Sequence, residues 1–166
     1  AGPERLLLVY VCRQGNTFIA QARELDPRFQ SLGPLFEMRT AQRELVLIEP
    51  ASSVEVKVTA KFSDGSTRDV TMLACYEVVS VAVAEVSTHG RVTRKESGET
   101  TLLVRFLHLQ EPVRLAFVPA RPGYKWANAQ PHNFIDREIY AKLQTLRMNP
   151  SALASDEVFL RRAYLD

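Results

Sequence analysis

A concentrated group of carboxylate and hydroxyl side chains lies in the stretch FSDGSTRDVT, residues 62–71. Asp64 and Asp69, together with the hydroxyl groups between them, are residue types that bind calcium in oxygen-lined loops. The EF-hand pattern D-x-[DN]-x-[DN]-G with a later Glu is absent, however. Asp-Gly-Ser is typical of a tight turn, in which Gly65 takes a positive φ angle at no steric cost. We therefore interpret Asp64, Gly65, Arg68 and Asp69 as structural turn residues.

Other charged pairs have simpler explanations than catalysis. Asp136 and Glu138 are two positions apart, so on a helix their side chains do not face each other as a catalytic pair of carboxylates must. An ion pair between Glu138 and Lys142, one helical turn apart, is the better interpretation. Arg161 and Arg162 are expected on a solvated helix face. No catalytic residue is predicted.

The histidines and cysteines form no recognisable metal or redox motif. His89, His108 and His132 are the only histidines, and none lies beside a cysteine or in an HExxH motif. Cys12 and Cys75 are far apart in sequence, without CxxC or zinc spacing. Two separate buried thiols are the simplest interpretation, and a single disulfide in an oxidising compartment is the alternative. The sequence predicts no metal site and no cofactor.

Two aromatic residues lie in the proline-containing stretch of residues 119–132. Tyr124 and Trp126 suit either of two roles: they pin this connector to a neighbouring domain, or they form a platform for a ligand. The stretch differs from a flexible linker rich in glycine and serine, so we expect it to be ordered. We therefore favour pinning, and Tyr124 and Trp126 are the predicted interdomain contact.

The composition is that of an ordinary folded protein. The chain has 166 residues, of which 46% are hydrophobic and 24% charged, so it suits one domain of ordinary size or one small domain with flanking pieces. Its net charge is +2 and its positive residues are scattered along the sequence, so a nucleic acid-binding face is not expected. The apolar run at residues 6–12 is too short to span a bilayer, which takes about 20 residues. Because the chain begins at Ala1 and stops at Asp166 inside a predicted helix, we expect a fragment of a longer protein.

Period-2 alternation predicts a β-rich central region. Over residues 54–61, small apolar side chains alternate with charged and hydroxyl side chains, which indicates one half-buried strand. Further strand-like runs are separated by turn signals, which favours an all-β sandwich. These runs lie at residues 44–48, 75–81, 83–87, 91–93, 100–109 and 112–118.

The regions on either side follow other patterns. Residues 6–12 are predicted as a strand and residues 16–26 as a short helix with its N-cap at Asn16 or Thr17. After the connector the hydrophobic period becomes helical. One helix is expected from the N-cap Asn133 to Asn149-Pro150, and a second is expected to begin at Ser155-Asp156-Glu157.

Four motifs follow one another in the central region: FSDGSTRDVT at residues 62–71, VAEV at 83–86, GRVT at 90–93 and GETT at 98–101. In this order they resemble the signature of bacterial Ig-like domains of group 2, and the resemblance covers residues 44–119. The proline that is usual before the VAEV segment is absent. The resemblance implies an Ig-like sandwich in which FSDGSTRDVT shapes one end. Ig-like folds carry many functions, so the fold alone gives none.

The motifs NFIDREIYAKL and SDEVFLRRAYLD lie in the tail, residues 133–166. They resemble the opening of an uncharacterised domain of large planctomycete-type secreted proteins, which are often accompanied by cytochrome c-like modules. The match covers only the first two helices of that domain. Because the chain has no CxxCH motif, the haem of the companion modules is not carried over.

These observations predict a mainly β fold, an Ig-like β-sandwich with a short α-helical C-terminal segment. The expected parts are a segment of unclear fold (1–43), the sandwich (44–119), a linker (120–132) and the first helices of a following, truncated helical domain (133–166).

The leading functional hypothesis is a non-catalytic structural or interaction module of a larger exported multidomain protein, acting as a spacer or binding domain. The resemblance alone places it outside the cytoplasm, in the periplasm or at the cell surface. Its expected partners are neighbouring domains of the same polypeptide, with a cell-surface protein or a glycan as a further candidate and without nucleic acid or a membrane span. One alternative is an accessory fragment of a carbohydrate-active or redox enzyme with its catalytic part elsewhere. Another is a cell-surface adhesion module.

Overall fold

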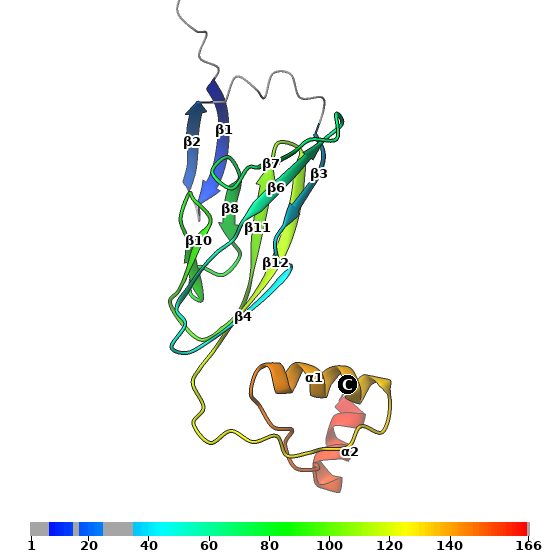
Figure 1. Cartoon of the computed structure of the whole chain (residues 1–166). Coiled ribbons are helices and arrows are strands. Elements are labelled where there is room, and N and C mark those ends of the chain that lie inside the picture. Colours follow the sequence, from blue (N-terminus) through cyan, green and yellow to red (C-terminus); the bar gives the residue numbers. More distant parts are fainter. Residues whose placement is uncertain (1–6, 15–16, 25–34, 166) are drawn as a thin grey trace, which may run out of the picture. The chain divides into compact units, whose positions relative to one another are not determined.

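The computed structural model describes residues 7–14, 17–24 and 35–165, with side chains from Leu35 to Leu165. The chain divides into two compact units, residues 1–120 and residues 121–166. The first unit is built from strands and the second contains two helices (Figure 1). The predicted fold class, a mainly β Ig-like sandwich with a short α-helical C-terminal segment, is confirmed.

The sandwich consists of three sheets around one hydrophobic core. A four-stranded sheet has the order β4-β12-β11-β8, and two three-stranded sheets have the orders β3-β6-β7 and β5-β10-β9. The strands are β3 (Leu35–Thr40), β4 (Glu44–Ile48), β5 (Ser53–Glu55), β6 (Val58–Phe62), β7 (Thr67–Asp69), β8 (Cys75–Val78), β9 (Ala84–Val86), β10 (Arg91–Arg94), β11 (Gly98–Phe106) and β12 (Leu109–Val118).

Alternating side chains of the long strands fill the core. Leu102 and Val104 of β11 and Val113, Leu115 and Phe117 of β12 are almost completely buried. Burying one such side chain contributes about 1.5–3 kcal/mol before the loss of conformational entropy is counted. The long β11–β12 hairpin is therefore the centre of the unit on which the other strands pack.

The strands β3 and β4 are consecutive in the chain but belong to different sheets. β3 is antiparallel to β6, whereas β4 is parallel to β12, with Glu44–Ile48 opposite Arg114–Val118. β3 was not predicted, because a register shift between Leu35 and Glu37 breaks its alternation. The buried side chains Leu35, Met38 and Thr40 therefore do not follow a period of two.

The prediction of one strand over residues 54–61 is wrong. The chain leaves the β5-β10-β9 sheet where the Val56 N–H donates to the Gly90 carbonyl at 2.9 Å. It joins the β3-β6-β7 sheet where the Ala41 N–H donates to the Lys57 carbonyl at 3.0 Å. The alternation runs through this crossing because both sheets face the same core, so the sequence pattern does not show the change of partner.

The predicted strand at residues 100–109 is also too long at its end. β11 stops at Phe106, which pairs with Leu109, so the turn consists of Leu107 and His108. Leu107 has a positive φ angle of 53°. The expected start of the next strand at Pro112 is therefore wrong by three residues, since β12 begins at Leu109. The turn was not predicted because it contains no glycine, the residue that usually marks a two-residue hairpin turn.

The N-terminal residues form a hairpin and not the predicted strand followed by a helix. β1 (Leu7–Gln14) pairs antiparallel with β2 (Thr17–Glu24), and Gln14 lies opposite Thr17. The helix predicted at residues 16–26 is thus wrong. Gly15 and Asn16, the two residues between the strands, are a dipeptide typical of two-residue hairpins. β1 lies alongside β8.

Cys75 in β8 is disulfide-bonded. The sequence has one other cysteine, Cys12, whose side chain lies outside the described residues. The interpretation as two separate buried thiols is therefore wrong. The two cysteines lack every short motif spacing, so only their three-dimensional arrangement could show the bond.

The second unit contains α1 (Phe134–Thr145) and α2 (Asp156–Leu165). Asn133 is the N-cap of α1, as predicted, because its side-chain oxygen accepts the Asp136 N–H at 2.9 Å. Neither helix buries any described residue, and several large apolar side chains are exposed. Within the described part of the chain, neither helix has the length and apolar character that crossing a bilayer requires.

Candidate functional site

The predicted turn residues are held by their own neighbours. The Asp64 carboxylate accepts hydrogen bonds from the Ser66 hydroxyl at 2.7 Å and the Ser66 N–H at 2.9 Å. These bonds hold the pKa of Asp64 below its usual value. Gly65 has a φ angle of +85° and donates its N–H to the Phe62 carbonyl at 3.0 Å. Arg68 lies in β7 opposite Ala60.

Asp69, at the end of β7, forms a second local turn. Its carboxylate accepts the Thr71 N–H at 2.9 Å, and hydrogen bonds from the Thr71 side chain and backbone lower the pKa of Asp69. The Thr71 hydroxyl oxygen in turn accepts the Val58 N–H at 2.9 Å. Asp64 and Asp69 therefore each stabilise a separate turn. Among the described residues, no three His, Cys, Asp or Glu side chains are placed to hold a metal ion.

The three histidines lie in three different connections. His89 precedes β10, and its Nδ1 is 3.2 Å from the Thr88 hydroxyl. His108 is in the β11–β12 turn, and His132 precedes α1, where its N–H donates to the Asp136 carboxylate at 2.9 Å. The three histidines therefore lie in separate connections and are not grouped in one site.

Two glutamates that the sequence did not single out join β4 to β12. Glu111 accepts the Thr40 N–H at 2.7 Å on one carboxylate oxygen and Arg43 Nε at 3.0 Å on the other. Glu49 accepts the Ala120 N–H at 2.7 Å and forms an ion pair with Arg94. Glu111 thus holds the chain just before β4 against β12, and Glu49 holds the chain just after β12 next to the end of β4.

The contacts of the Glu49 carboxylate predict that the free energy of unfolding depends on pH in the acidic range. The hydrogen bond from the Ala120 N–H, followed by that from Arg94, lowers the pKa of Glu49 in the folded state. A carboxyl with a lowered folded pKa stabilises the fold above its unfolded pKa, and this contribution is lost as the pH falls through the folded pKa. We expect the free energy of unfolding to fall between about pH 5 and pH 3.

Urea unfolding at several pH values checks this expectation. Wild type should be more stable than Glu49→Gln at neutral pH, and the difference should shrink towards pH 3. Glu96→Gln changes an exposed glutamate away from this contact and serves as the control. A difference between wild type and Glu49→Gln that stays constant across the pH range would contradict the role of the ionised carboxylate.

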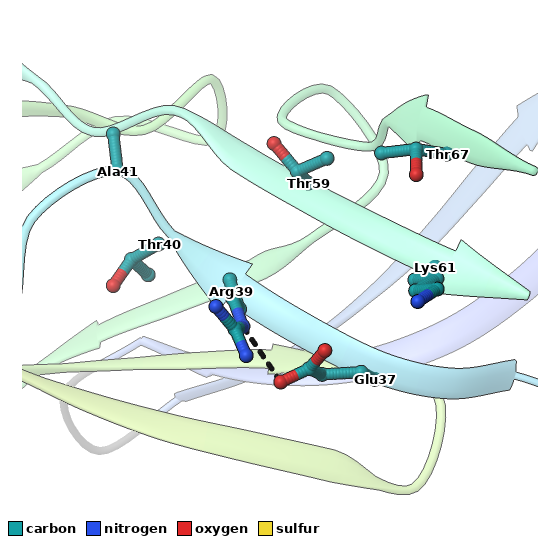
Figure 2. Close-up of a pocket in the computed structure, with 7 residues that line it drawn as sticks. All are labelled: Glu37, Arg39, Thr40, Ala41, Thr59, Lys61 and Thr67. Atoms are coloured by element: carbon teal, nitrogen blue, oxygen red, sulfur yellow. Dashed lines mark hydrogen bonds and ion pairs between the residues drawn. The ribbon is translucent and has the colours of Figure 1, made fainter.

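An open pocket of about 420 Å³ lies on the outer face of the β3-β6-β7 sheet. Figure 2 shows Glu37 and Arg39 from β3, Thr59 and Lys61 from β6, and Thr67 from β7 around it. Arg39 Nε donates to Glu37 Oε1 at 2.6 Å, so these two charges pair on the surface. Lys61 adds a positive charge to the same face.

An exposed aromatic ring lies beside this pocket. Phe36 is 70% exposed, and Lys61 Nζ is 6.0 Å from the centre of its ring, at the outer limit for a cation–π contact. Hydroxyl groups, charged groups and an exposed ring are the kinds of group that hydrogen-bond to and stack on polar ligands. The sequence did not reveal this face, because its residues come from strands that the register shift and the sheet crossing concealed.

The predicted contact residues Tyr124 and Trp126 lie in the helical unit. The Trp126 ring packs edge to face against Tyr140 of α1, with ring centres 5.7 Å apart and an interplanar angle of 62°. The Asn149 side chain accepts the Ala127 N–H at 2.9 Å and donates to the Lys125 carbonyl at 3.0 Å. The Tyr124 hydroxyl is 3.5 Å from the Met148 carbonyl oxygen. These contacts tie the connector to the helices that follow it.

Trp126 is the only tryptophan, so its fluorescence reports this contact directly. We expect emission that is blue-shifted from free indole in water, and a shift to the red in Tyr140→Ala, because the ring then loses its packing partner. Tyr164→Ala removes an 87% exposed ring in α2 and should leave the spectrum unchanged. Water-like emission from the wild type would show that the ring is not packed in solution.

No protein-family model matches the chain, and no curated protein matches it. The crystal structure of the S-layer protein SbsC domains 4 and 5 is 16% identical, with 63% of this chain and 60% of that chain covered and a TM-score of 0.43. The structure of the surface layer protein SbsC, domains 1–6, is 15% identical, with 65% of this chain and 16% of that chain covered and a TM-score of 0.44. The chain thus spans less than two thirds of either of these proteins.

Proposed function

We propose that this chain is a non-catalytic structural module of a larger exported multidomain protein, in which the sandwich acts as a spacer. The observation that carries the proposal is the pairing of β4 with β12, closed at both ends by Glu111 and Glu49. This pairing fixes the chain where it enters the four-stranded sheet to the chain where it leaves the sandwich. A spacer needs a fixed exit of this kind, because the exit sets the direction in which the following neighbour leaves.

The non-catalytic part of the proposal is supported by the carboxylates. Hydrogen bonds lower the pKa of Glu49, Asp64 and Asp69, and each carboxylate is engaged by the strand end or turn that it stabilises. A general acid or base works best with a pKa near the operating pH, so these groups suit structure better than proton transfer.

The exported part of the proposal is supported by the disulfide at Cys75. Disulfides form and persist mainly in oxidising compartments such as the periplasm and the cell surface. Disulfides are rare in cytosolic proteins, so the bond favours a location outside the cytoplasm.

The helical unit is proposed to be the start of a larger helical domain. Phe134, Ile135, Ile139, Phe159 and Leu165 are each at least half exposed, which is unusual for the apolar face of a helix. In a longer protein these faces are expected to pack against further chain. Amide exchange of α1 and α2 should then be slower in the longer protein than in the 166-residue chain, and equal rates would refute the docking.

The pocket beside Phe36 supports binding at the cell surface as a second candidate function. A replacement experiment in the longer protein separates it from the spacer function. If the sandwich is a spacer, an unrelated β-sandwich of matched length restores activity or assembly, and the triple variant Phe36→Ser, Arg39→Ala, Lys61→Ala behaves as wild type. If the pocket binds a partner, the triple variant fails and so does the replacement.

A further inference from the structure

The strand β3 presents an extra side chain on the outer face of its sheet. Leu35 lies opposite Phe62 and Glu37 lies opposite Lys61, so Phe36 has no counterpart in β6. Phe36 is 70% exposed and Glu37 lines the outer pocket, so both of these neighbouring side chains belong to the outer face. β-Bulges re-aim side chains in this way and are common next to active sites.

The pocket on this face contains polar groups that the fold itself does not use. Within the part of the chain that the structure describes, the hydroxyls of Thr59 on β6 and Thr67 on β7 are not engaged by another residue. The Lys61 ammonium forms no ion pair with a described residue, and its contact is the Phe36 ring. Figure 2 shows these three side chains on the β6 and β7 strands and the Arg39–Glu37 pair on β3. Two hydroxyl groups and an ammonium group are therefore available to a ligand.

The charges of the pocket indicate which ligands it suits. Arg39 and Lys61 are positive and Glu37 is negative, so these side chains together carry one net positive charge. Arg39 uses Nε to bind Glu37, so its two terminal nitrogens keep their donors. A ligand with one carboxylate complements this charge, whereas a densely sulfated or phosphorylated ligand would bring several negative charges against Glu37.

The exposed ring and the hydroxyls indicate a sugar as the carrier of that carboxylate. A pyranose has an apolar face of C–H groups, which packs on an aromatic ring such as Phe36, and a rim of hydroxyl groups. The hydroxyls of Thr59 and Thr67 both donate and accept hydrogen bonds, as sugar hydroxyls do. The pocket volume of about 420 Å³ lies in the usual range for small-ligand sites, about 300–1,000 Å³.

The position of the pocket disfavours an extended peptide as the ligand. Peptides that bind to sheets add a strand at an edge, where backbone hydrogen bonds provide the affinity. This pocket includes the central strand β6, whose backbone pairs with β3 on one side and β7 on the other. A ligand on this face is therefore recognised mainly through side chains.

We propose that the outer face of the β3-β6-β7 sheet binds an acidic saccharide, a sugar of the uronic acid type that carries a carboxylate on its ring. The apolar face of the sugar packs on Phe36, and its carboxylate binds Lys61 and Arg39. The sugar hydroxyls bind Thr59 and Thr67. This inference deepens the second candidate function and rests on it, because it names the ligand class of that pocket.

An NMR titration of the full 166-residue chain tests the proposal with oligosaccharides of galacturonic, glucuronic and mannuronic acid. The methyl ester of each oligosaccharide is the matched control, because it keeps the ring and the hydroxyls and removes the charge. We expect at least one acid to bind and to shift the amides of residues 36–39, 59–61 and 67. Its ester should bind at least about threefold more weakly. Absence of binding by all three acids, or shifts confined to other strands, would overturn the proposal.

Variants assign the contacts. Lys61→Met keeps the apolar stem and removes the charge, so we expect it to bind the acid only as weakly as the ester. Lys95→Met makes the same change at an exposed lysine that lines a different pocket, and it should keep the difference between acid and ester. Phe36→Ser should weaken acid and ester alike, by about threefold to tenfold. Equal binding of acid and ester by the wild type, or a Lys61→Met variant that still separates them, would contradict the proposed contacts.

A glutamate-rich peptide is the competing ligand. It carries carboxylates without a sugar ring, so we expect it to bind more weakly than the best uronate and to be insensitive to Phe36→Ser. A peptide that displaces the uronate at equal concentration would show that the face recognises charge alone, and the saccharide proposal would fall.

The titration and the replacement experiment fail independently. If no uronate binds and the triple variant still fails in the longer protein, the ligand class is wrong and the pocket has another partner. If a uronate binds and an unrelated sandwich restores activity or assembly, the ligand class is correct and the spacer function does not depend on it.

Discussion

Replacing Gly90 by alanine is expected to destabilise the sandwich by about 3 kcal/mol or more. A Cβ atom at this position would lie 2.8 Å from Cζ and 2.9 Å from the hydroxyl oxygen of Tyr76, and 2.9 Å from the Val56 carbonyl oxygen. Tyr76 is buried and its hydroxyl donates to the Thr71 carbonyl at 2.8 Å, so the ring has little room to move. Gly90 also has a φ angle of +79°, which side chains rarely adopt.

Gly65→Ala is the matched control for this prediction. Gly65 has a similar φ angle of +85°, but a Cβ there would meet no atom within 4 Å. Its substitution should cost only the backbone strain, about 1–2 kcal/mol. Urea unfolding of both variants gives the comparison. If Gly90→Ala costs no more than Gly65→Ala, the close packing of Tyr76 against Gly90 is wrong; if Gly65→Ala costs nothing, the positive φ angle of the turn is wrong.

The contrast between these two glycines shows what a local pattern can predict. The positive φ angle of Gly65 follows from the Asp-Gly-Ser turn, which was expected from the sequence and is present. The close approach of Gly90 to Tyr76 depends on strands that are distant in sequence. No spacing within the GRVT motif shows which ring will lie over its glycine.

The same distinction separates the correct strands from the wrong ones. β4, β9 and β10 were found because each has a short run of strand-forming residues bounded by turn residues, and β8 was found too, but it ends at Val78 and the predicted run extended to residue 81. The crossing at Val56 and Lys57 and the register shift in β3 were missed, because both concern which strand is the partner rather than which side chain is apolar. The helix predicted at residues 16–26 failed for a related reason: pairing with β1 overrode a weak helical signal.

The glutamates that join β4 to β12 could not have been predicted from local sequence. Glu49 lies before a proline and Glu111 lies before another, so each resembles an ordinary residue of a connection. The Glu111 partners Thr40 and Arg43 are 71 and 68 positions away in the chain, and the Glu49 partners Ala120 and Arg94 are 71 and 45 positions away. The packing of β3 and β10 beside the paired strands β4 and β12 brings these groups together.

Reduction of the disulfide at Cys75 is expected to lower the free energy of unfolding by about 2–4 kcal/mol. The bond restricts the unfolded chain, so its loss increases the entropy of that state and lowers Tm by about 5–15 °C. β1 lies alongside β8, the strand that contains Cys75, so the amides of β1 should lose protection from exchange before those of β11 and β12.

Thermal unfolding with and without reductant measures this effect, and Cys75→Ala is the control because it has no disulfide to lose. Wild type should become less stable in reductant, whereas the stability of Cys75→Ala should not change. Thiol titration of unfolded, unreduced wild type should find no free thiol, and two free thiols would contradict the bond. The same measurement tests the proposed location. If the fold needs the disulfide to be stable at its working temperature, an oxidising compartment is favoured. If the fold is equally stable without the disulfide, the main support for export is removed.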